Sequence, residues 1–358
     1  MLSFNRVFGA GAPLRQRPIW TGPERLLPGV VVSQIRPFKM RQKTTPAPGI
    51  DRIAYSGSIY AVVSGGLYTG ASLQALSARS LPIVSVASLQ AFGGEIFIFG
   101  PNSQSIYMTY RSSDGVTWTS ANGGGGNGDQ LYVVNGRLFT VGVYNQTLRE
   151  YNPATGAFVN RALPEPGVRD WSGIYHNGAV FLICCAAGSS YTSGSALVSE
   201  DGVTFTSASA AFTAAVRLMP IGASYVYVLG SKFIAVGSNS QLGHIATMES
   251  TNGRDWALTG TCQVAAPGRT IQQLSQRGIV IDGVLYVGVV FADNGKFVPT
   301  LLSTTDGIAW RAHADADVLN NNPANIEIFR RPGSNGLILC CTNFETDPEN
   351  GTELYYEL

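Results

Sequence analysis

The sequence predicts an all-β protein: a seven-bladed β-propeller of four-stranded antiparallel blades, with an extended N-terminal arm. Three observations predict this fold. Charged residues make up only 13% of the 358 residues, whereas 45% are hydrophobic and 42 residues are glycine, a composition that favours a large core with many turns over a helical bundle. Two-residue turn signals recur in two alternating series after residue 50. A short side-chain motif also repeats around one of these series.

The first series of turn signals joins pairs of apolar, β-branched or aromatic runs. Its seven members are Ser56-Gly57, Gly93-Gly94, Asn135-Gly136, Asn177-Gly178, Gly230-Ser231, Asp282-Gly283 and Asn335-Gly336. The second series also has seven members, which are Thr69-Gly70, Asp114-Gly115, Thr155-Gly156, Asp201-Gly202, Asn252-Gly253, Asp306-Gly307 and Asn350-Gly351. Asn-Gly and Asp-Gly pairs favour type I′ hairpins, because both central residues of that turn need positive φ. Each unit therefore contains two hairpins and hence four strands.

A four-stranded antiparallel sheet that repeats every ~40–50 residues is typical of a propeller blade. Seven units predict seven blades, all within residues 51–358. Two ways of closing the ring stay open: the last run, 353–358, serves as the outer strand of the seventh blade, or part of the arm completes a blade.

Four members of the second series share the pattern Ser/Thr-x-Asp/Asn-Gly-x-x-Trp/Phe, which we call the box. Its acidic or amide, glycine and aromatic positions are Asp114, Gly115 and Trp118; Asp201, Gly202 and Phe205; Asn252, Gly253 and Trp256; and Asp306, Gly307 and Trp310. The hydroxyl and the carboxylate or amide can hydrogen-bond the backbone of the turn, glycine permits its dihedral angles, and the aromatic ring packs against the neighbouring sheet. We predict a structural role for all four boxes.

The box resembles the Asp-box, or BNR, repeat of sialidase-like β-propellers and of many propeller domains in bacteriophage structural proteins. The resemblance covers roughly residues 51–358. The sialidase form has a residue between Asp and Gly that is absent here, so the shortened box looks more like the variant of phage tail and virion proteins. The resemblance implies a propeller of that kind, and it is specific for the hairpin rather than for an activity.

Catalytic patterns are scarce. A sialidase needs three arginines around a carboxylate, a Tyr-Glu pair and an acid-base Asp, but the Arg-Ile-Pro signature of that family does not occur, and the nearest matches are Arg17-Pro18 and Arg331-Pro332. The sequence contains three histidines and no nucleophile elbow, Walker loop or dinucleotide fingerprint. We therefore predict no catalytic residues, no cofactor and no enzymatic activity, with a glycoside hydrolase kept as the third hypothesis.

The five cysteines predict neither disulfides nor a metal site. They are Cys184, Cys185, Cys262, Cys340 and Cys341. Adjacent cysteines on a strand point to opposite faces, which makes them poor disulfide partners, and no CxxC pair or histidine at ligand spacing accompanies them. We expect reduced, buried thiols.

Seven longer segments are expected to open on the face opposite the tight turns, where a scaffold would hold binding loops. These segments are 120–129, 163–170, 186–195, 237–244, 260–273, 290–299 and 311–325. The candidates for binding on this face are Trp171, Tyr191, His244, Lys296 and His313. The alternative is that each is an ordinary loop residue.

Residues 1–50 differ from the rest of the chain and form the predicted arm, whereas residues 51–358 form the propeller. The arm holds one acidic residue, Glu24, and carries a net charge of +7, against −6 for the remainder. Its basic residues are Arg6, Arg15, Arg17, Arg25, Arg36, Lys39, Arg41 and Lys43. Seven prolines favour an extended backbone. The arm could neutralise phosphates, strap onto a neighbouring subunit or be a solvated tail; the apolar residues between its charges favour the strap.

No membrane segment is predicted, because the longest uncharged apolar run, Ala179–Ala187, has nine residues, far below the ~20 of a membrane span. Residues 1–13 lack the pattern of a signal peptide. We expect a soluble chain that is made in a cytoplasm.

The leading hypothesis is a non-enzymatic bacteriophage virion structural protein of the tail or its attachment apparatus, assembled in the host cytoplasm. Its propeller would be an interaction module that the arm docks to other virion proteins. The rival hypothesis is a carbohydrate-binding propeller that recognises a host surface glycan. No membrane insertion and no nucleic-acid partner are expected.

Overall fold

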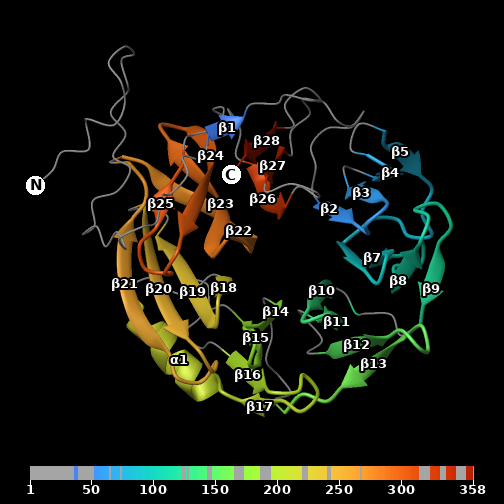
Figure 1. Cartoon of the computed structure of the whole chain (residues 1–358), viewed down its shortest axis with the longest axis horizontal. Helices are drawn as coiled ribbons and strands as arrows, with labels where there is room; N and C mark the ends of the chain where they lie inside the picture. Colours follow the sequence, from blue (N-terminus) through green and yellow to red (C-terminus); the bar gives the residue numbers. More distant parts are fainter. Residues whose placement is uncertain are drawn as a thin grey trace, which may run out of the picture.

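The computed structural model contains seven four-stranded antiparallel sheets arranged around a ring (Figure 1). It describes residues 36–38, 52–63, 66–72, 75–122, 126, 129–142, 147–164, 173–185, 195–219, 225–239, 243–266, 268–313, 323–330, 336–343 and 352–357. Within these residues the one α-helix is α1 (Ser209–Leu218), which follows the fourth blade and packs on it through Phe212, Ala215 and Val216.

Six of the sheets each consist of four consecutive strands, and we number these blades in chain order. Blade 1 has β2 (Arg52–Tyr55), β3 (Tyr60–Val63), β4 (Leu67–Gly70) and β5 (Ser77–Arg79). Blade 2 has β6 (Ser88–Phe92), β7 (Glu95–Pro101), β8 (Tyr107–Ser112) and β9 (Thr119–Ala121). Blade 3 has β10 (Gln130–Val134), β11 (Arg137–Val141), β12 (Leu148–Asn152) and β13 (Ala157–Arg161).

The other three consecutive blades follow the same order. Blade 4 has β14 (Gly173–His176), β15 (Phe181–Cys185), β16 (Ser195–Ser199) and β17 (Thr206–Ser207). Blade 5 has β18 (Tyr225–Leu229), β19 (Lys232–Asn239), β20 (His244–Ser250) and β21 (Ala257–Gln263). Blade 6 has β22 (Thr270–Ile281), β23 (Val284–Asp293), β24 (Lys296–Thr304) and β25 (Arg311–Ala312).

The seventh sheet is built differently, because it combines the two ends of the chain. Its order is β26 (Pro323–Arg330), β27 (Leu337–Asn343), β28 (Thr352–Glu357) and β1 (Arg36–Phe38). β28 is the third strand and pairs with β27, while β1 forms the outer edge, with Arg36 opposite Glu357 and Phe38 opposite Tyr355. Of the two predicted ways of closing the ring, the arm supplies the outer strand.

The prediction of seven blades is therefore wrong as stated: residues 51–358 contain six blades of the two-hairpin kind, not seven. The prediction failed at the last turn signal of the second series. Asn350-Gly351 lies outside the described residues, but the strand that follows it, β28, pairs with β27 and with β1. This signal therefore precedes a third strand, and the fourth strand of the sheet is β1.

The first series of turns forms the hairpins between the first and second strands of each sheet. Asn135 and Gly136 have φ of 49° and 67°, and Asp282 and Gly283 have 50° and 78°, as type I′ turns require. Thr69 and Gly70, by contrast, lie within β4 and not in a turn. The predicted loop 290–299 is likewise a pair of long strands joined by a tight turn at Asn294-Gly295, with φ of 51° and 76°.

Because each blade is an antiparallel meander, its connections alternate between two ends of the ring. We call the turn face the end that carries the turns between first and second and between third and fourth strands. The loop face is the opposite end, which carries the connections between second and third strands and those between blades.

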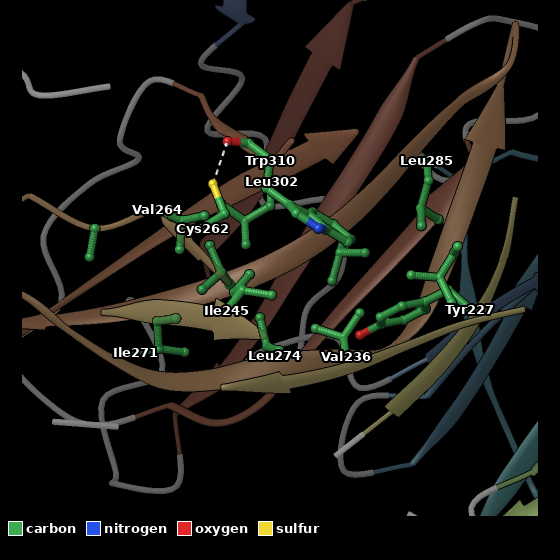
Figure 2. Close-up of a cluster of buried hydrophobic side chains, with 14 of the residues drawn as sticks. Tyr227, Val236, Ile245, Cys262, Val264, Ile271, Leu274, Leu285, Leu302 and Trp310 are labelled. Carbon is green, nitrogen blue, oxygen red and sulfur yellow. Dashed lines mark hydrogen bonds between the residues drawn. The ribbon is translucent and has the colours of Figure 1, made fainter. Parts of the chain in front are cut away.

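The core lies between the sheets. Figure 2 shows the cluster between blades 5 and 6, where Tyr227, Val236 and Ile245 of blade 5 meet Leu285 and Trp310 of blade 6. At the closing contact, Val62 of blade 1 packs with Ile338 of the seventh sheet. The sheets therefore form a closed ring.

Two of the five cysteines have described side chains. Cys184 and Cys262 are buried, reduced thiols, as predicted. The Cys262 thiol also donates to the Trp310 carbonyl oxygen at 3.7 Å (Figure 2).

Candidate functional sites

The box turns are held by their own side chains. In blade 2, the Ser112 hydroxyl donates to Asp114 Oδ1 at 2.8 Å and accepts the N–H of Gly115 at 2.8 Å. Asp114 Oδ1 also accepts the N–H groups of Val116 at 2.8 Å and Thr117 at 2.7 Å. One hydroxyl and one carboxylate thus satisfy three backbone donors of the turn.

The same arrangement recurs in blades 4, 5 and 6. Asp201 Oδ1 accepts from Val203 and Thr204, Asn252 Oδ1 from Arg254 and Asp255, and Asp306 Oδ1 from Ile308 and Ala309, all between 2.7 and 2.9 Å. The backbone donors, first among them Val116, hold the pKa of Asp114 well below its usual range, and the corresponding N–H groups of Thr204 and Val203 lower the pKa of Asp201 to about 2. These carboxylates stay ionised near neutral pH.

The box turns are not type I′ turns, contrary to the prediction for the second series. Only their glycines have positive φ: 71° at Gly115, 68° at Gly202, 70° at Gly253 and 77° at Gly307. In the box turns, side-chain hydrogen bonds fix the backbone conformation, whereas in a type I′ turn two residues with positive φ fix it.

The box aromatics lie at different depths. Trp310 and Phe205 are buried, with 1% and 5% of their surface exposed, whereas Trp118 and Trp256 are half-buried. The Trp256 indole N–H donates to the Gly253 carbonyl oxygen at 3.0 Å and its ring lies 5.2 Å from the Phe212 ring of α1. Trp310 packs against blade 5 (Figure 2).

Box turns also bond to the preceding blade. The Thr69 hydroxyl of blade 1 donates to the Gly115 carbonyl oxygen of blade 2 at 2.9 Å. Arg137 of blade 3 donates to the Asp201 and Gly202 carbonyl oxygens of blade 4 at 2.6 and 3.2 Å. We call these contacts the interblade bridges; the motif gave no indication of their donors.

A third interblade bridge joins blades 4 and 5. The Asn177 amide donates to the carbonyl oxygens of Ser231 at 2.8 Å and Thr251 at 2.7 Å. Asn177 belongs to a first-series turn, so the two series of turns meet on the turn face.

Of the five loop-face candidates, Trp171 and Tyr191 lie outside the described residues. His244 begins β20, and its Nε2 contacts the Gln263 side-chain oxygen. Lys296 is exposed after the Asn294-Gly295 turn. In the described part of the chain no hydrogen bond, ion pair or ring contact joins His244, Lys296 and His313 to one another.

His313 is half-buried. Its Nε2 lies 2.7 Å from the Ser303 hydroxyl and its ring lies 6.2 Å from the Tyr286 ring. Burial lowers the pKa of His313 to about 4, so the imidazole is neutral near pH 7.

The arm contributes one described basic position. Arg36 lies in β1, where it is opposite Glu357. The other seven, which are Arg6, Arg15, Arg17, Arg25, Lys39, Arg41 and Lys43, lie outside the described residues.

The first strands of the sheets bring further polar residues to the centre of the ring. Arg277 of blade 6 donates to the Leu131 carbonyl oxygen of blade 3 at 3.4 Å and stands over the Tyr132 ring at 5.8 Å, although these blades are not neighbours (Figure 1). Gln90 of blade 2 donates to the same carbonyl oxygen at 3.2 Å. Burial raises the pKa of Tyr132 to about 12. Three blades therefore meet at Leu131, a convergence that strand periodicity alone does not reveal.

The buried carboxylate of Asp129 lies immediately before the first strand of blade 3. Asp129 is 1% exposed, and its Oδ2 accepts from the Gly126 N–H at 3.0 Å and from Arg149 at 3.2 Å. Its Oδ1 has no hydrogen-bond partner among the described residues. Burial raises the pKa of Asp129 to about 6.

Two further searches of the described residues gave no candidate site. No group of three or more His, Cys, Asp or Glu side chains could hold a metal ion there. None of the helical structure described is long and apolar enough to cross a membrane.

Comparison with known proteins supports the fold. No family model and no curated protein sequence matches the chain, so the resemblance to the Asp-box repeat rests on the motif alone. Among solved structures, YCF48 bound to D1 peptide has 12% sequence identity and a TM-score of 0.58, and the match covers 94% of this chain and 99% of that one.

Two other solved structures give a similar result. YCF48 from Cyanidioschyzon merolae has 12% identity and a TM-score of 0.54, over 87% of this chain and 97% of that one. The extracellular domain of the hybrid two component system BT4673 from B. thetaiotaomicron has 12% identity and a TM-score of 0.53, over 90% of this chain and 39% of that one. At these identities the likeness shows the β-propeller fold alone.

Proposed function

We propose that the chain is a non-enzymatic protein-interaction propeller. The proposal rests on the observation that the described acidic side chains of the boxes form hydrogen bonds with the backbone of the ring itself. Asp114, Asp201 and Asp306 accept backbone N–H groups of their own turns, and the boxes of blades 2, 4 and 5 receive interblade bridges. A scaffold of this kind presents surfaces to a partner.

The titratable groups do not suit general acid-base chemistry. A carboxylic acid catalyst needs a pKa near the working pH, but the pKa of the Asp114 and Asp201 carboxyls lies below the usual range. His313 is neutral, half-buried and hydrogen-bonded to Ser303. Asp129 has a raised pKa, yet its Oδ2 is paired with Arg149 and the residue is buried.

A protein segment is the partner that we favour. The similar propeller YCF48 was solved bound to a peptide, so a ring of this shape is compatible with a peptide ligand. More specifically, we propose that the chain is a bacteriophage virion protein of the tail region, assembled in the host cytoplasm, whose arm contacts other virion proteins. The shortened box and the basic arm with its interleaved apolar residues support this more specific proposal.

The test is a deletion that respects the fold. Deletion of residues 1–45 would remove β1 and open the seventh sheet, so we choose deletion of residues 1–34, which keeps β1 paired with β28. The truncated chain is expected to keep a cooperative urea unfolding transition but to be lost from purified particles in a complementation assay. Normal incorporation of the truncated chain would contradict a docking role for the arm.

Two assays of the full chain address the competing functions. We expect no signal on a glycan array and no turnover of a panel of fluorogenic glycosides. Saturable binding to one glycan class would favour the carbohydrate-binding hypothesis, and robust turnover would overturn the non-enzymatic assignment.

A further inference from the structure

Exposed apolar side chains follow the box glycines on the turn face. The residue after the glycine is Val116 in blade 2, Val203 in blade 4 and Ile308 in blade 6, with 55%, 40% and 44% of their surface exposed. Their backbone N–H groups are bound by the box carboxylates, so the turn holds these side chains outward. One such exposed apolar residue therefore occurs in each of blades 2, 4 and 6.

More apolar surface lies closer to the centre of the same face. Tyr55, Val133 and Val280 stand just before first-series turns and are 37%, 39% and 40% exposed. On the connections of the loop face, by contrast, the exposed large apolar residues Val84, Ile106 and Leu218 lie outside any repeat. The turn face is thus the one with a repeated apolar pattern, as interaction surfaces have.

The turn face also carries negative charge. Its carboxylates outside ion pairs, within the described residues, are Asp114, Glu200, Asp201, Asp255, Asp282 and Asp306. The described cations of this face are Arg254, Arg311 and Arg330, together with Arg111, Arg137 and Lys232, which are paired with Glu95, Glu150 and Glu249. The excess of carboxylates makes this face complementary to a basic, partly apolar segment.

The chain itself has such a segment, and that segment joins the ring on this face. Arg36 is opposite Glu357, and Tyr356 is opposite Leu337, the first residue after the first-series turn of the seventh sheet. The N-terminal end of β1 therefore lies at the turn face, on the outer edge of the ring. Residues 1–35 must connect there.

The composition and length of residues 1–35 fit this surface. The segment has four arginines and one acidic residue, and it includes Phe4, Phe8 and Trp20. Thirty-five extended residues reach about 115 Å, enough to cross the face of one propeller. Attachment to the rim of the same face also gives the segment a local concentration of about millimolar.

We propose that residues 1–35 dock on the turn face of their own ring. The arginines lie against the box carboxylates, and the apolar side chains cover Val116, Val203 and Ile308. The inference goes beyond the proposed function because it assigns a resting position to the arm in the free chain. A neighbouring subunit then has to compete with this internal contact.

The test uses a fluorescent synthetic peptide of residues 1–35. Anisotropy is measured with the full chain and with the chain that lacks residues 1–34. The peptide is expected to bind the truncated chain at least ten-fold more tightly than the full chain, and binding should weaken as salt is raised. Equal affinity for the two chains, or no binding to the truncated chain, would overturn the proposal.

Matched variants locate the contact. Val116→Ser, Val203→Ser and Ile308→Ser together, in the truncated chain, should weaken peptide binding at least ten-fold, because they remove the apolar contacts without changing the charge. The control, Val84→Ser with Ile106→Ser on the loop face, should not change it; equal losses would refute a site on the turn face. Light scattering of the full chain should give a monomer, and a dimer that dissociates on truncation would assign the face to a second copy instead.

Discussion

The turn face and the loop face use the same kinds of polar side chain in opposite ways. On the turn face, Asp114 and Asp201 are exposed, accept several backbone N–H groups and have lowered pKa values. On the connections of the loop face, Asp129 is buried and His313 is half-buried, and desolvation shifts the pKa of each group so that its neutral form is favoured. Hydrogen bonds to the backbone therefore fix charge on one face, whereas desolvation removes it on the other.

The largest expected effect comes from the aromatic beneath a box turn. Trp310→Ala should lower the free energy of unfolding by about 3–5 kcal/mol, because a 1% exposed indole leaves a cavity between blades 5 and 6. Trp256→Ala is the matched control, and its half-buried ring should cost less. Urea denaturation measures both. Equal losses would mean that burial does not set the contribution of the box aromatics.

Acid sensitivity should come from His313. The unfolded chain takes up a proton near pH 6.5 and the folded chain only near pH 4, so this residue stabilises the fold above pH 6.5, and the contribution is lost as the pH falls to 4. The loss is about 3 kcal/mol. His313→Gln should remove this part of the pH dependence, measured as the slope of unfolding free energy against pH. An unchanged slope would contradict the assignment.

Asp129 should produce the opposite slope. Its folded pKa of about 6 lies above the ordinary value of 3.8, so ionisation costs the folded state stability as the pH rises from about 4 to 6, by about 3 kcal/mol. Asp129→Asn should therefore make the slope more positive in that window, while His313→Gln makes it less positive. If both variants changed the slope in the same direction, the opposite contributions of Asp129 and His313 to the pH dependence would be refuted.

The smallest effect is expected on the exposed box itself. Asp114→Ala should lower the unfolding temperature slightly, because the N–H groups of Val116 and Thr117 lose their acceptor. Asp114→Asn should cost little, since Asn252 makes the same two bonds in blade 5. Thermal unfolding of the two variants distinguishes a need for the acceptor oxygen from a need for the charge.

Local signals predicted the local structure. Asn135-Gly136 and Asp282-Gly283 encode their own turn geometry, and the box carries its hydrogen-bond groups within a few residues. Four-stranded blades follow from such signals. The same logic failed at Asn350-Gly351, because a turn signal does not say which strands it separates.

Long-range partners were not predictable in this way. β1 pairs with β28, more than 300 residues later, and Arg277 contacts Leu131 across 146 residues. Both depend on the ring being closed. The loop-face candidates show the same limit, because the sequence does not distinguish a half-buried His313 from an exposed Lys296. Asp129 was not selected at all, since its burial results from packing and not from a motif.

The pairing of β1 with β28 has a consequence for biosynthesis. β1 leaves the ribosome early, but its partner strand is completed only when residue 357 has been made. Blades 1 to 6 can form in succession during translation, whereas the ring stays open until β28 has emerged. The first of the described strands is therefore the last to find its partner.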